Sequence, residues 1–518
     1  MYGMMPPMSF ARDPAGWLEE TPGRANRVFL RTPQGRDLSY AALREQSGRI
    51  ASALIQRGVL PGDRIAVQVD KSPEAVLLYV ACLRLGAVFV PINVANTPNE
   101  VEYFLLDSQP RLAVIRPQDV SAIEPLARES GILLESLGAN GDGSLLTSAA
   151  ESADFELPTR FDPSSIAAII YTSGTTGRSK GAMLTRANLA SNAAVLAEAW
   201  RFTGGDVLLH TLPLFHIHGL FAAINTVLAS SSSLFFLSRF DAAETLQHLR
   251  EATVYMGVPT HYTRLLQQNG LCQETTATMR LFISGSAPLL PETHREFLQR
   301  TGHVILERYG MSETLMNTSN PYEGLRLPGS VGPPLKGTAI RVTNAESGAV
   351  EAEPDVIGTL QVRGPNVFAG YWRDEEKTRS EFTADGWFKS GDVGRIDRNG
   401  YVHIVGRAKD LVISGGYNVY PKEVEVELDA LAGVLESAVF GVPHPDFGEG
   451  VTAAVVAKPG AALSEETIID SVKARLARYK VPKRILLVDE LPRNTMGKVQ
   501  KNALRKTFAA IYAGKGCG

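Results

Sequence analysis

Helical and strand-like hydrophobic patterns alternate along residues 38–160, and this alternation limits the possible folds more than any other feature of the sequence. Apolar side chains recur at helical spacing within residues 41–57 and again within residues 73–85. Each of these stretches is followed by a short apolar run, at 64–69 and at 87–92, of the kind that forms a buried strand. Because strands that alternate with helices pack as a sheet covered on both faces, the sequence predicts a doubly wound α/β fold.

Composition narrows the class of protein. With 518 residues the chain is too long for a single hydrophobic core, so several domain-sized units are expected. A net charge of −3 without a basic stripe argues against nucleic-acid binding. Three scattered cysteines do not suggest a disulfide framework, and no apolar run reaches the ~18 residues of a membrane span. Since no secretory signal is recognisable, we expect a cytoplasmic protein. We also expect a monomer or weak homodimer without membrane or nucleic-acid partners.

A segment rich in glycine and hydroxyl groups, residues 171–181, directly follows the apolar run at 166–170. Its glycines allow the backbone to turn sharply, its hydroxyls and backbone N–H groups can donate hydrogen bonds to phosphate oxygens, and Lys180 adds a cation. It is not a Walker loop, because Gly174 and Gly177 are two residues too close together. The segment predicts a phosphate-binding loop after a strand, with a plain surface turn as the alternative.

Three further segments carry side chains suited to a binding site. His216 and His218 can line a pocket; a metal site would lack a third ligand at a convincing spacing, and a place in the core is the alternative. Residues 281–289 predict an apolar strand that ends in small residues, which permits close approach of a flat ligand such as a purine. Residues 305–314 combine an aromatic ring, a hydroxyl and a carboxylate, as a site for a nucleotide and a hard cation would require.

Five motifs occur in the order found in the adenylate-forming acyl-CoA synthetases, and the chain resembles that family from about residue 38 to residue 505. The motifs are residues 171–181, 309–314, 386–392, 406–410 and 492–498. The resemblance implies a large N-terminal domain of doubly wound αβ subdomains, residues 1–405, and a small mobile α+β C-terminal domain, residues 406–518, with a hinge near Lys409. Within the family the chain most resembles the malonyl-CoA synthetases, in the segments 257–264, 282–287 and 311–319.

The resemblance implies a two-step ligase that uses ATP, Mg²⁺ and coenzyme A. A carboxylate attacks the α-phosphate of ATP to give an acyl-adenylate and pyrophosphate, and the thiol of CoA then displaces AMP. By the same resemblance Lys498, Glu313 and His216 are the expected catalytic residues, and Glu313 and Thr175 the metal ligands. The residues expected to bind ATP are Thr172, Ser173, Gly174, Thr175, Thr176, Gly177, Lys180, Ser286, Ala287, Pro288, Glu307, Arg308, Tyr309, Gly310, Met311, Ser312, Asp392 and Arg407. Those expected to line the CoA channel are Gly415, Gly416 and Tyr417.

The acid is predicted to be a short dicarboxylate, malonate first and methylmalonate second. A second carboxylate that becomes buried needs a cationic partner, and the planar fork of arginine suits it. Arg264 matches the arginine that contacts this carboxylate in malonyl-CoA synthetases, and Arg280 is the alternative. His216, Ser284 and Met311 would complete the acid pocket. A medium-chain or aryl acyl-CoA ligase, and a nucleotide- or acyl-binding protein without turnover, are the alternatives for the whole protein.

Overall fold

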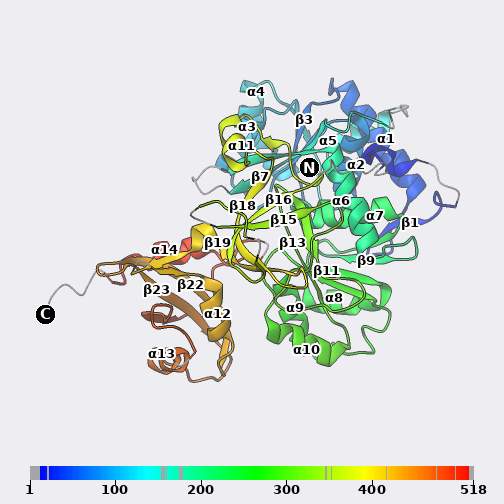
Figure 1. Ribbon diagram of the computed structural model, residues 1–518. Helices are drawn as coiled ribbons and strands as arrows, with labels where there is room; N and C mark the ends of the chain where they lie inside the picture. Colours follow the sequence, from blue (N-terminus) through cyan, green and yellow to red (C-terminus); the bar gives the residue numbers. More distant parts are fainter. Residues whose placement is uncertain are drawn as a thin grey trace. The chain divides into compact units, whose positions relative to one another are not determined.

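The computed structural model describes residues 12–19, 23–152, 158, 160–173, 179–344, 347–351, 353–415, 417–473, 475–495 and 497–512 (Figure 1). The chain divides into two compact units, Met1–Ala339 with Val362–Phe388, and Ile340–Gln361 with Lys389–Gly518. Both units combine helices and strands, which confirms the predicted α/β class. The domain boundary expected between residues 405 and 406 stays a prediction. None of the helices in the described ranges is long and apolar enough to cross a membrane.

A seven-stranded sheet in the first unit contains the predicted alternation of helix and strand. Its strand order is β17-β8-β7-β4-β3-β5-β6, and β4, β3, β5 and β6 run parallel. The strands are β3 (Arg64–Gln68), β4 (Val88–Pro91), β5 (Leu112–Ile115), β6 (Leu133–Ser136), β7 (Ile166–Ser173), β8 (Ser179–Thr185) and β17 (Gly370–Tyr371). The helices of this region are α1 (Tyr40–Gln56), α2 (Pro73–Leu85), α3 (Pro98–Ser108), α4 (Val120–Glu129), α5 (Ser144–Glu151) and α11 (Glu375–Glu381). The two helices and two strands predicted from the hydrophobic pattern are thereby confirmed.

Helix α2 shows how the local sequence sets such boundaries. The Ser72 side chain accepts a hydrogen bond from the backbone N–H of Ala75, and Pro73 occupies the first turn, where a helix does not need the N–H that proline lacks. The helix ends at Gly86, whose φ of 81° lies in the left-handed region that glycine adopts without strain. Nearly every side chain of α2 is buried, so this helix belongs to the interior of the first unit.

The second sheet of the first unit has eight strands in the order β14-β13-β12-β11-β9-β10-β1-β2. They are β1 (Val28–Arg31), β2 (Asp37–Ser39), β9 (Val207–His210), β10 (Ser233–Phe236), β11 (Val254–Gly257), β12 (Leu281–Ser284), β13 (Leu306–Met311) and β14 (Leu315–Ser319). The helices of this region are α6 (Arg186–Ala199), the π-helix η3 (His218–Ile224), α7 (Asn225–Ser230), α8 (Ala242–His248), α9 (Pro259–Leu266) and α10 (Pro291–Thr301). Strands β9, β11, β12 and β13 run parallel, so their carboxyl ends, where ligands bind in such sheets, share one edge.

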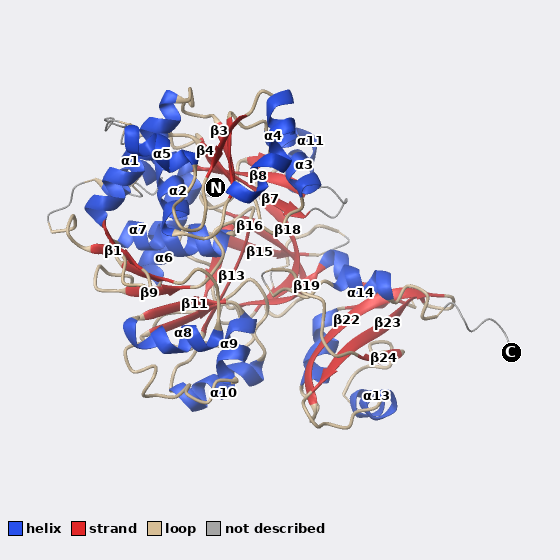
Figure 2. Ribbon diagram, turned by 180° about the vertical axis from the view of Figure 1, so that it is seen from behind, coloured by secondary structure: helices blue, strands red, loops and turns tan. Residues whose placement is uncertain are grey.

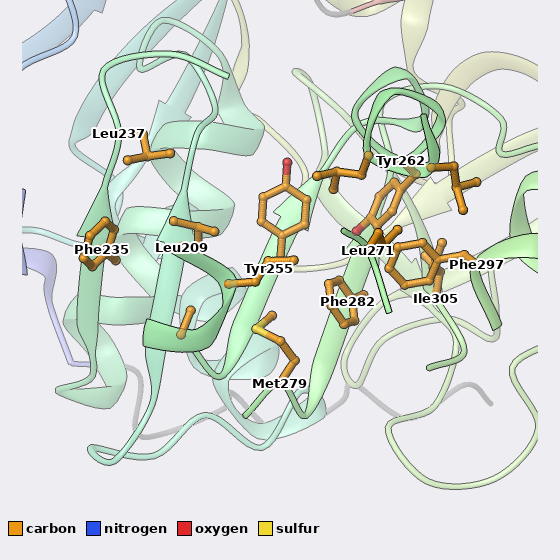
Figure 3. Close-up of a cluster of buried hydrophobic side chains, with 14 of the residues drawn as sticks. Leu209, Phe235, Leu237, Tyr255, Tyr262, Leu271, Met279, Phe282, Phe297 and Ile305 are labelled. Atoms are coloured by element: carbon orange, nitrogen blue, oxygen red, sulfur yellow. The ribbon is translucent and has the colours of Figure 1, made fainter. Parts of the chain in front are cut away.

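Aromatic side chains form the core between this sheet and helices α9 and α10 (Figure 3). The rings of Tyr262 on α9 and Phe297 on α10 pack edge to face with centroids 5.4 Å apart, and Phe282 on β12 meets Phe297 at 4.9 Å. All three side chains are fully buried. Such pairs contribute ~0.5–1.5 kcal/mol beyond the burial of apolar area. The cluster therefore holds α9 firmly against the strands that carry the site described below.

The second unit contains two sheets (Figure 2). One has the strand order β15-β16-β18-β19, and the other has the order β21-β20-β23-β22 with β24 beside β23. The strands are β15 (Ala339–Thr343), β16 (Gly358–Arg363), β18 (Phe388–Ile396), β19 (Val402–Arg407), β20 (Val412–Ser414), β21 (Tyr417–Val419), β22 (Val434–His444), β23 (Gly448–Ala457) and β24 (Arg484–Leu487). The helices are the short η5 (Ala408–Asp410), α12 (Pro421–Asp429), α13 (Glu465–Lys473) and α14 (Lys501–Thr507).

Alternate side chains of β22 enter two different cores. Val439 packs with residues of α12 and α13, such as Leu428 and Val472, on one face of the sheet. Phe440, the next residue along, packs with Leu504 of α14 on the other face. This alternation is the period of two expected for a strand with both faces covered.

Asp429, at the end of α12, is a partly buried acid whose ionisation disfavours folding. Desolvation raises its pKa from 3.8 to about 6, although the Ser437 hydroxyl donates a hydrogen bond of 2.7 Å to Oδ1. Because the folded state holds this proton more tightly than the unfolded state, the free energy of unfolding falls as the pH rises from about 4 to about 6. The Asp429→Asn variant keeps the acceptor for Ser437, so we expect it to raise the free energy of unfolding by about 1–2 kcal/mol near neutral pH.

Urea denaturation of the full chain near neutral pH and at about pH 4 checks this expectation, because the gain should disappear at the lower pH. Asp470→Asn is the matched control, since Asp470 is an exposed acid of the same unit, 2.8 Å from Lys473. Its effect should stay below about 0.5 kcal/mol at both pH values. A destabilised Asp429→Asn protein near neutral pH, or an equal gain at both pH values, would contradict the role given to Asp429.

Candidate active site

The predicted phosphate-binding loop connects two antiparallel strands. Strands β7 and β8 pair with Thr172 opposite Lys180, and residues 174–178 between them lie outside the described residues. The predictions for Gly174, Thr175, Thr176 and Gly177, and for the side chain of Ser173, therefore have no structural test here. A strand follows this loop, whereas a helix follows a Walker loop, which agrees with the distinction drawn from the glycine spacing.

Helix α3 anchors both arms of this hairpin. The hydroxyl of Tyr103 donates a hydrogen bond of 2.6 Å to the carbonyl oxygen of Ser179, at the start of β8. The hydroxyl of Tyr171, on β7, donates to the carboxylate of Asp107. The ends of the loop are thus fixed to the body of the first unit by contacts on either side.

Glu313 lies buried beside the arms of this loop. Its Oε1 atom accepts a hydrogen bond of 3.2 Å from the hydroxyl of Tyr371, and the Thr172 hydroxyl lies 3.5 Å from the same oxygen. The Lys180 Nζ atom is 5.7 Å from the centroid of the Tyr371 ring. The structure therefore brings together Thr172 and Lys180 from one motif and Glu313 from another, and it adds Tyr371, which no motif suggested.

A magnesium ion suits this group of residues. Mg²⁺ prefers oxygen ligands and is usually held by one or two carboxylates together with the phosphates of the substrate. Glu313 supplies such a carboxylate, next to hydroxyls and a lysine that can face phosphate oxygens. Within the described ranges no three His, Cys, Asp or Glu residues are grouped to hold a metal. The phosphates of ATP would supply further oxygen ligands to an ion held by Glu313. Thr175, the second expected ligand, lies outside the described residues.

Arg308, on β13, is a buried cation without an acidic partner among the described residues. Its Nε and Nη2 atoms make no hydrogen bond there, and burial lowers its pKa to about 9. The guanidinium lies against Gly285: a Cβ atom at Gly285 would be 2.4 Å from the Arg308 Cζ atom, so only glycine leaves room for it. An unpaired buried charge is unfavourable in the free protein. Arg308 is therefore suited to bind an anion that enters the site.

Several histidine and serine side chains lie in the same part of the first unit, and the charge of Arg308 affects one of them, His218. Nδ1 of His218 lies 3.2 Å from the Ser286 hydroxyl, and the His218 ring is buried, so desolvation, with a further contribution from Arg308, keeps its pKa well below the ordinary value. Desolvation also lowers the pKa of His216 to about 4 and that of His261 to about 3. Ser284, at the end of β12, has a buried hydroxyl with no hydrogen-bond partner in the described structure. These groups can face an anion without adding positive charge of their own.

Lys71, which no sequence motif suggested, adds a second cation near these histidines. Its Nζ atom donates a hydrogen bond of 2.9 Å to the carbonyl oxygen of His210 and lies 4.5 Å from the centroid of the Phe236 ring. Desolvation holds the pKa of Lys71 well below its ordinary value. Its charge also contributes to the lowered pKa values of His210 and His261.

The two arginines predicted to meet a distal carboxylate differ in their surroundings. Arg264 is exposed in the last turn of α9. Arg280 forms an ion pair of 2.6 Å with Asp206 and donates to the carbonyl oxygens of Trp200 and Arg201. Because its donors already have partners, Arg280 is not suited to bind a substrate carboxylate, and it drops out as the alternative to Arg264.

The remaining expected ATP residues of the first unit lie at the carboxyl ends of β12 and β13. Ser286 follows β12 with a φ of 73°, a strained value for a residue other than glycine, as often found at binding sites. The Glu307 Oε1 atom accepts a hydrogen bond from the backbone N–H of Gly329. The other residues of this set are Ala287 and Pro288 after β12, Tyr309, Gly310 and Met311 in β13, and Ser312 after it.

In the second unit, Asp392 and Arg407 face each other across neighbouring strands. They are paired in the register of β18 and β19, and the Arg407 Nε atom lies 2.7 Å from the Asp392 Oδ1 atom. Lys498 follows Gly497 in a turn where the backbone N–H of Lys498 donates to the Asn494 side chain. Desolvation, followed by the charge of Arg407, lowers the pKa of Lys498. Three residues predicted to act at the same nucleotide are therefore neighbours within this unit.

The hinge and CoA predictions fall on a short stretch of the second unit. Lys409 lies in η5, directly after β19. Gly415 has a φ of 59° and donates its N–H to the Phe447 carbonyl oxygen. Tyr417 is exposed and stacks on Tyr479 with ring centroids 4.7 Å apart, while Gly416 lies outside the described residues. The roles given to these residues stay predictions.

Relatives of known function span nearly the whole chain. The profile of the AMP-binding enzyme family matches residues 16–372, and that of the AMP-binding enzyme C-terminal domain matches residues 423–498. Malonate–CoA ligase of Arabidopsis thaliana is 33% identical in an alignment 540 residues long, which covers 94% of this chain and 87% of that protein. Oxalate–CoA ligase of Arabidopsis thaliana is 34% identical over 487 residues, which cover 91% of this chain and 94% of that protein.

A solved structure agrees with the same assignment. The crystal structure of ATP-bound MatB from Rhodopseudomonas palustris matches with a TM-score of 0.94 and 52% sequence identity, covering 96% of this chain and 99% of that one. The large N-terminal domain and small C-terminal domain expected from the motifs are therefore confirmed. The chain belongs to the AMP-binding enzyme family and is an AMP-forming acyl-CoA synthetase.

Proposed function

We propose that this protein ligates malonate, and less readily methylmalonate, to coenzyme A through a malonyl-adenylate, with release of pyrophosphate and AMP. The observation that carries the proposal is the buried Arg308 guanidinium, whose Nε and Nη2 atoms have no hydrogen-bond partner among the described residues. A monocarboxylic acid has no second charge to offer this cation, whereas the distal carboxylate of a short diacid does. The similarity to a malonate–CoA ligase supports the same choice.

The residues that interact electrostatically with Arg308 support its assignment to the acid side of the site. Tyr262 affects the ionisation of Arg308 and lies on α9, the helix that carries Arg264. His218, which responds to the charge of Arg308, follows His216 by two residues. Arg264 and His216 are the residues predicted to bind the acid, so Arg308 is better assigned to the distal carboxylate than to ATP. Met311 and Ser284 complete this pocket in the proposal.

The two steps then divide among the described residues as follows. Thr172 and Lys180 would contact the terminal phosphates of ATP, and Glu313 would hold a magnesium ion, which supplies positive charge beside those phosphates. Asp392 and Arg407 bind the ribose hydroxyls, and Lys498 bridges the attacking carboxylate and the α-phosphate. Lys409 is the proposed hinge residue, Lys498 is assigned to the adenylation step, and the Gly415 segment is assigned to the thioester step.

A substrate panel tests the proposal. Purified protein is supplied with ATP, Mg²⁺ and CoA, and AMP release is measured with malonate, methylmalonate, oxalate, acetate or octanoate as the acid. We expect malonate to give the highest kcat/KM, at least tenfold above acetate and octanoate. Mass spectrometry of the CoA thioester identifies the product.

Other results would select an alternative. Faster AMP release with octanoate than with malonate would point to an acyl-CoA ligase for uncharged acids. A preference for oxalate would keep the diacid class but reject malonate. If the protein binds ATP but releases no AMP with any of the five acids, the result would favour a binding protein without turnover.

A further inference from the structure

Tyr371 lies in a short edge strand whose position is fixed by its backbone. Strand β17 pairs with β8, so that Tyr371 is opposite Ala182. The N–H of Trp372 donates a hydrogen bond of 2.8 Å to the Gly181 carbonyl oxygen, one residue beyond Lys180. The Trp372 indole N–H donates a second bond, of 3.0 Å, to the Asp107 carbonyl oxygen on α3. The backbone of Tyr371 is therefore tied to the arm of the phosphate-binding loop.

The side chain of Tyr371 contacts both charged groups of the magnesium–phosphate site. Its hydroxyl donates to Glu313 Oε1 at 3.2 Å, and its ring centroid lies 5.7 Å from Lys180 Nζ. The Tyr371 ring also packs edge to face on Phe368, with centroids 4.9 Å apart, and the Phe368 N–H donates to the Glu313 carbonyl oxygen. Tyr371 thus holds the side chain of Glu313, and Phe368 holds its backbone.

Such a contact matters for a carboxylate that must bind a metal. The Tyr371 and Thr172 hydroxyls both approach Oε1 of Glu313, which sets the rotation of the carboxylate group. A carboxylate held in this way does not have to reorganise when an ion arrives, and hydrogen-bond partners of metal ligands typically affect metal affinity by about 10–100-fold. The phenol is buried, so water does not readily replace it.

We propose that Tyr371 is a positioning residue that orients Glu313 toward magnesium and holds Lys180 beside it, so that it sets the affinity for the magnesium complex of ATP. The inference rests on the proposed function of Glu313 as the magnesium ligand. It predicts that the Tyr371 hydroxyl affects ATP binding only when magnesium is present, because it acts through Glu313. The Tyr371 ring should affect ATP binding with or without magnesium, because it acts through Lys180. The two roles can be separated, because Tyr371→Phe removes only the hydroxyl and Tyr371→Leu removes the ring as well.

Calorimetric titration of ATP into the full-length protein, with Mg²⁺ and with EDTA, measures these roles without turnover. For Tyr371→Phe we expect Kd to rise about tenfold with Mg²⁺ and to stay within about twofold of wild type in EDTA. For Tyr371→Leu we expect Kd to rise under both conditions, because Lys180 loses its aromatic neighbour. The Mg²⁺ concentration for half-maximal AMP release should rise about tenfold in Tyr371→Phe.

Two controls make the test specific. Tyr40→Phe also removes a buried hydroxyl, one that donates to the carbonyl oxygens of Val227 and Ser232, and it should lower thermal stability without changing either Kd. In the Glu313→Gln background, Tyr371→Phe should cause less than about a twofold further change, because a residue that acts through Glu313 has nothing left to orient.

Two results would overturn the role of Tyr371. One is a Tyr371→Phe protein with wild-type Kd for ATP in Mg²⁺. The other is an equal loss with Mg²⁺ and with EDTA, which would indicate a structural effect only. Neither result bears on malonate, since the substrate panel decides the acid independently. Conversely, a protein that releases no AMP but loses magnesium-dependent ATP binding in Tyr371→Phe would retain this inference and reject the proposed function.

Discussion

The Arg308→Met variant is expected to be more stable than the wild type and to lose malonate turnover by about 100–1,000-fold. Two physical effects act in opposite directions. Truncating one partner of a buried, hydrogen-bonded charge pair costs about 2–5 kcal/mol, so the complex with a diacid is weakened. In the free protein the same change removes a buried guanidinium that has no acidic partner in the described structure, and replacing such a charge with an apolar side chain is often stabilising.

The experiment combines kcat/KM for malonate and acetate with the midpoint of thermal unfolding. Acetate turnover should stay within about threefold of wild type, because acetate has no distal carboxylate to lose its partner. For Arg308→Lys, kcat/KM for malonate should lie between the values of the wild type and of Arg308→Met, since a lysine retains the charge but not the planar fork.

Arg264→Met is the companion variant, because Arg264 is exposed and its replacement should not change stability by more than about 0.5 kcal/mol. If Arg264 meets the same carboxylate, this variant should also lose malonate turnover. Unchanged malonate turnover in Arg308→Met would remove the structural basis for choosing a diacid. Equal losses of malonate and acetate turnover would instead assign Arg308 to ATP, as the sequence motif suggested.

The Lys498→Ala variant should form the acyl-adenylate about 100–1,000-fold more slowly than wild type. Removal of a single group that stabilises charge in the transition state typically has this effect. The turn itself should persist, because Asn494 N–H donates to the Lys498 carbonyl oxygen and the Lys498 N–H donates to the Asn494 side chain, and neither bond needs the lysine side chain. The loss should therefore be chemical and should leave the unfolding midpoint unchanged.

Single-turnover formation of adenylate from malonate and ATP measures the first step. Reaction of prepared malonyl-adenylate with CoA measures the second, which should stay within about fivefold of wild type if Lys498 serves adenylation alone. Lys506→Ala is the control, since Lys506 is an exposed lysine of the following helix, α14. Adenylate formation at the wild-type rate in Lys498→Ala, or equal loss of both steps, would contradict the proposed role.

The structure confirms the parts of the fold that depend on local sequence. Helix α2 begins and ends at the predicted residues because Ser72 and Gly86 supply the caps at its two ends. Strand β3 begins at the first residue of its predicted range, 64–69, because a short apolar run between helices leaves few alternatives. The order of the five motifs was sufficient to indicate the family, and the comparisons with known proteins agree.

Contacts between distant residues could not be predicted in this way. Tyr371 is 58 residues from Glu313 in the chain, and only the pairing of β17 with β8 brings its hydroxyl to that carboxylate. From the sequence, Arg280 was the alternative to Arg264 for the distal carboxylate, and Arg308 was expected to bind ATP. Folding pairs Arg280 with Asp206 and leaves Arg308 buried against Gly285.

The sequence by itself determined the α/β class, the approximate boundaries of α1, α2, β3 and β4, the family, and the identity of the residues in its motifs. These properties depend on neighbours within a few positions, whose spacing sets hydrophobic periodicity, capping and turns. The tertiary structure decided which arginine is paired with an acid, which one is buried without such a partner among the described residues, and which side chain donates a hydrogen bond to Glu313. Burial and pairing of charge depend on residues far apart in the chain, and the free energy of a buried ion depends on what surrounds it rather than on its own residue type.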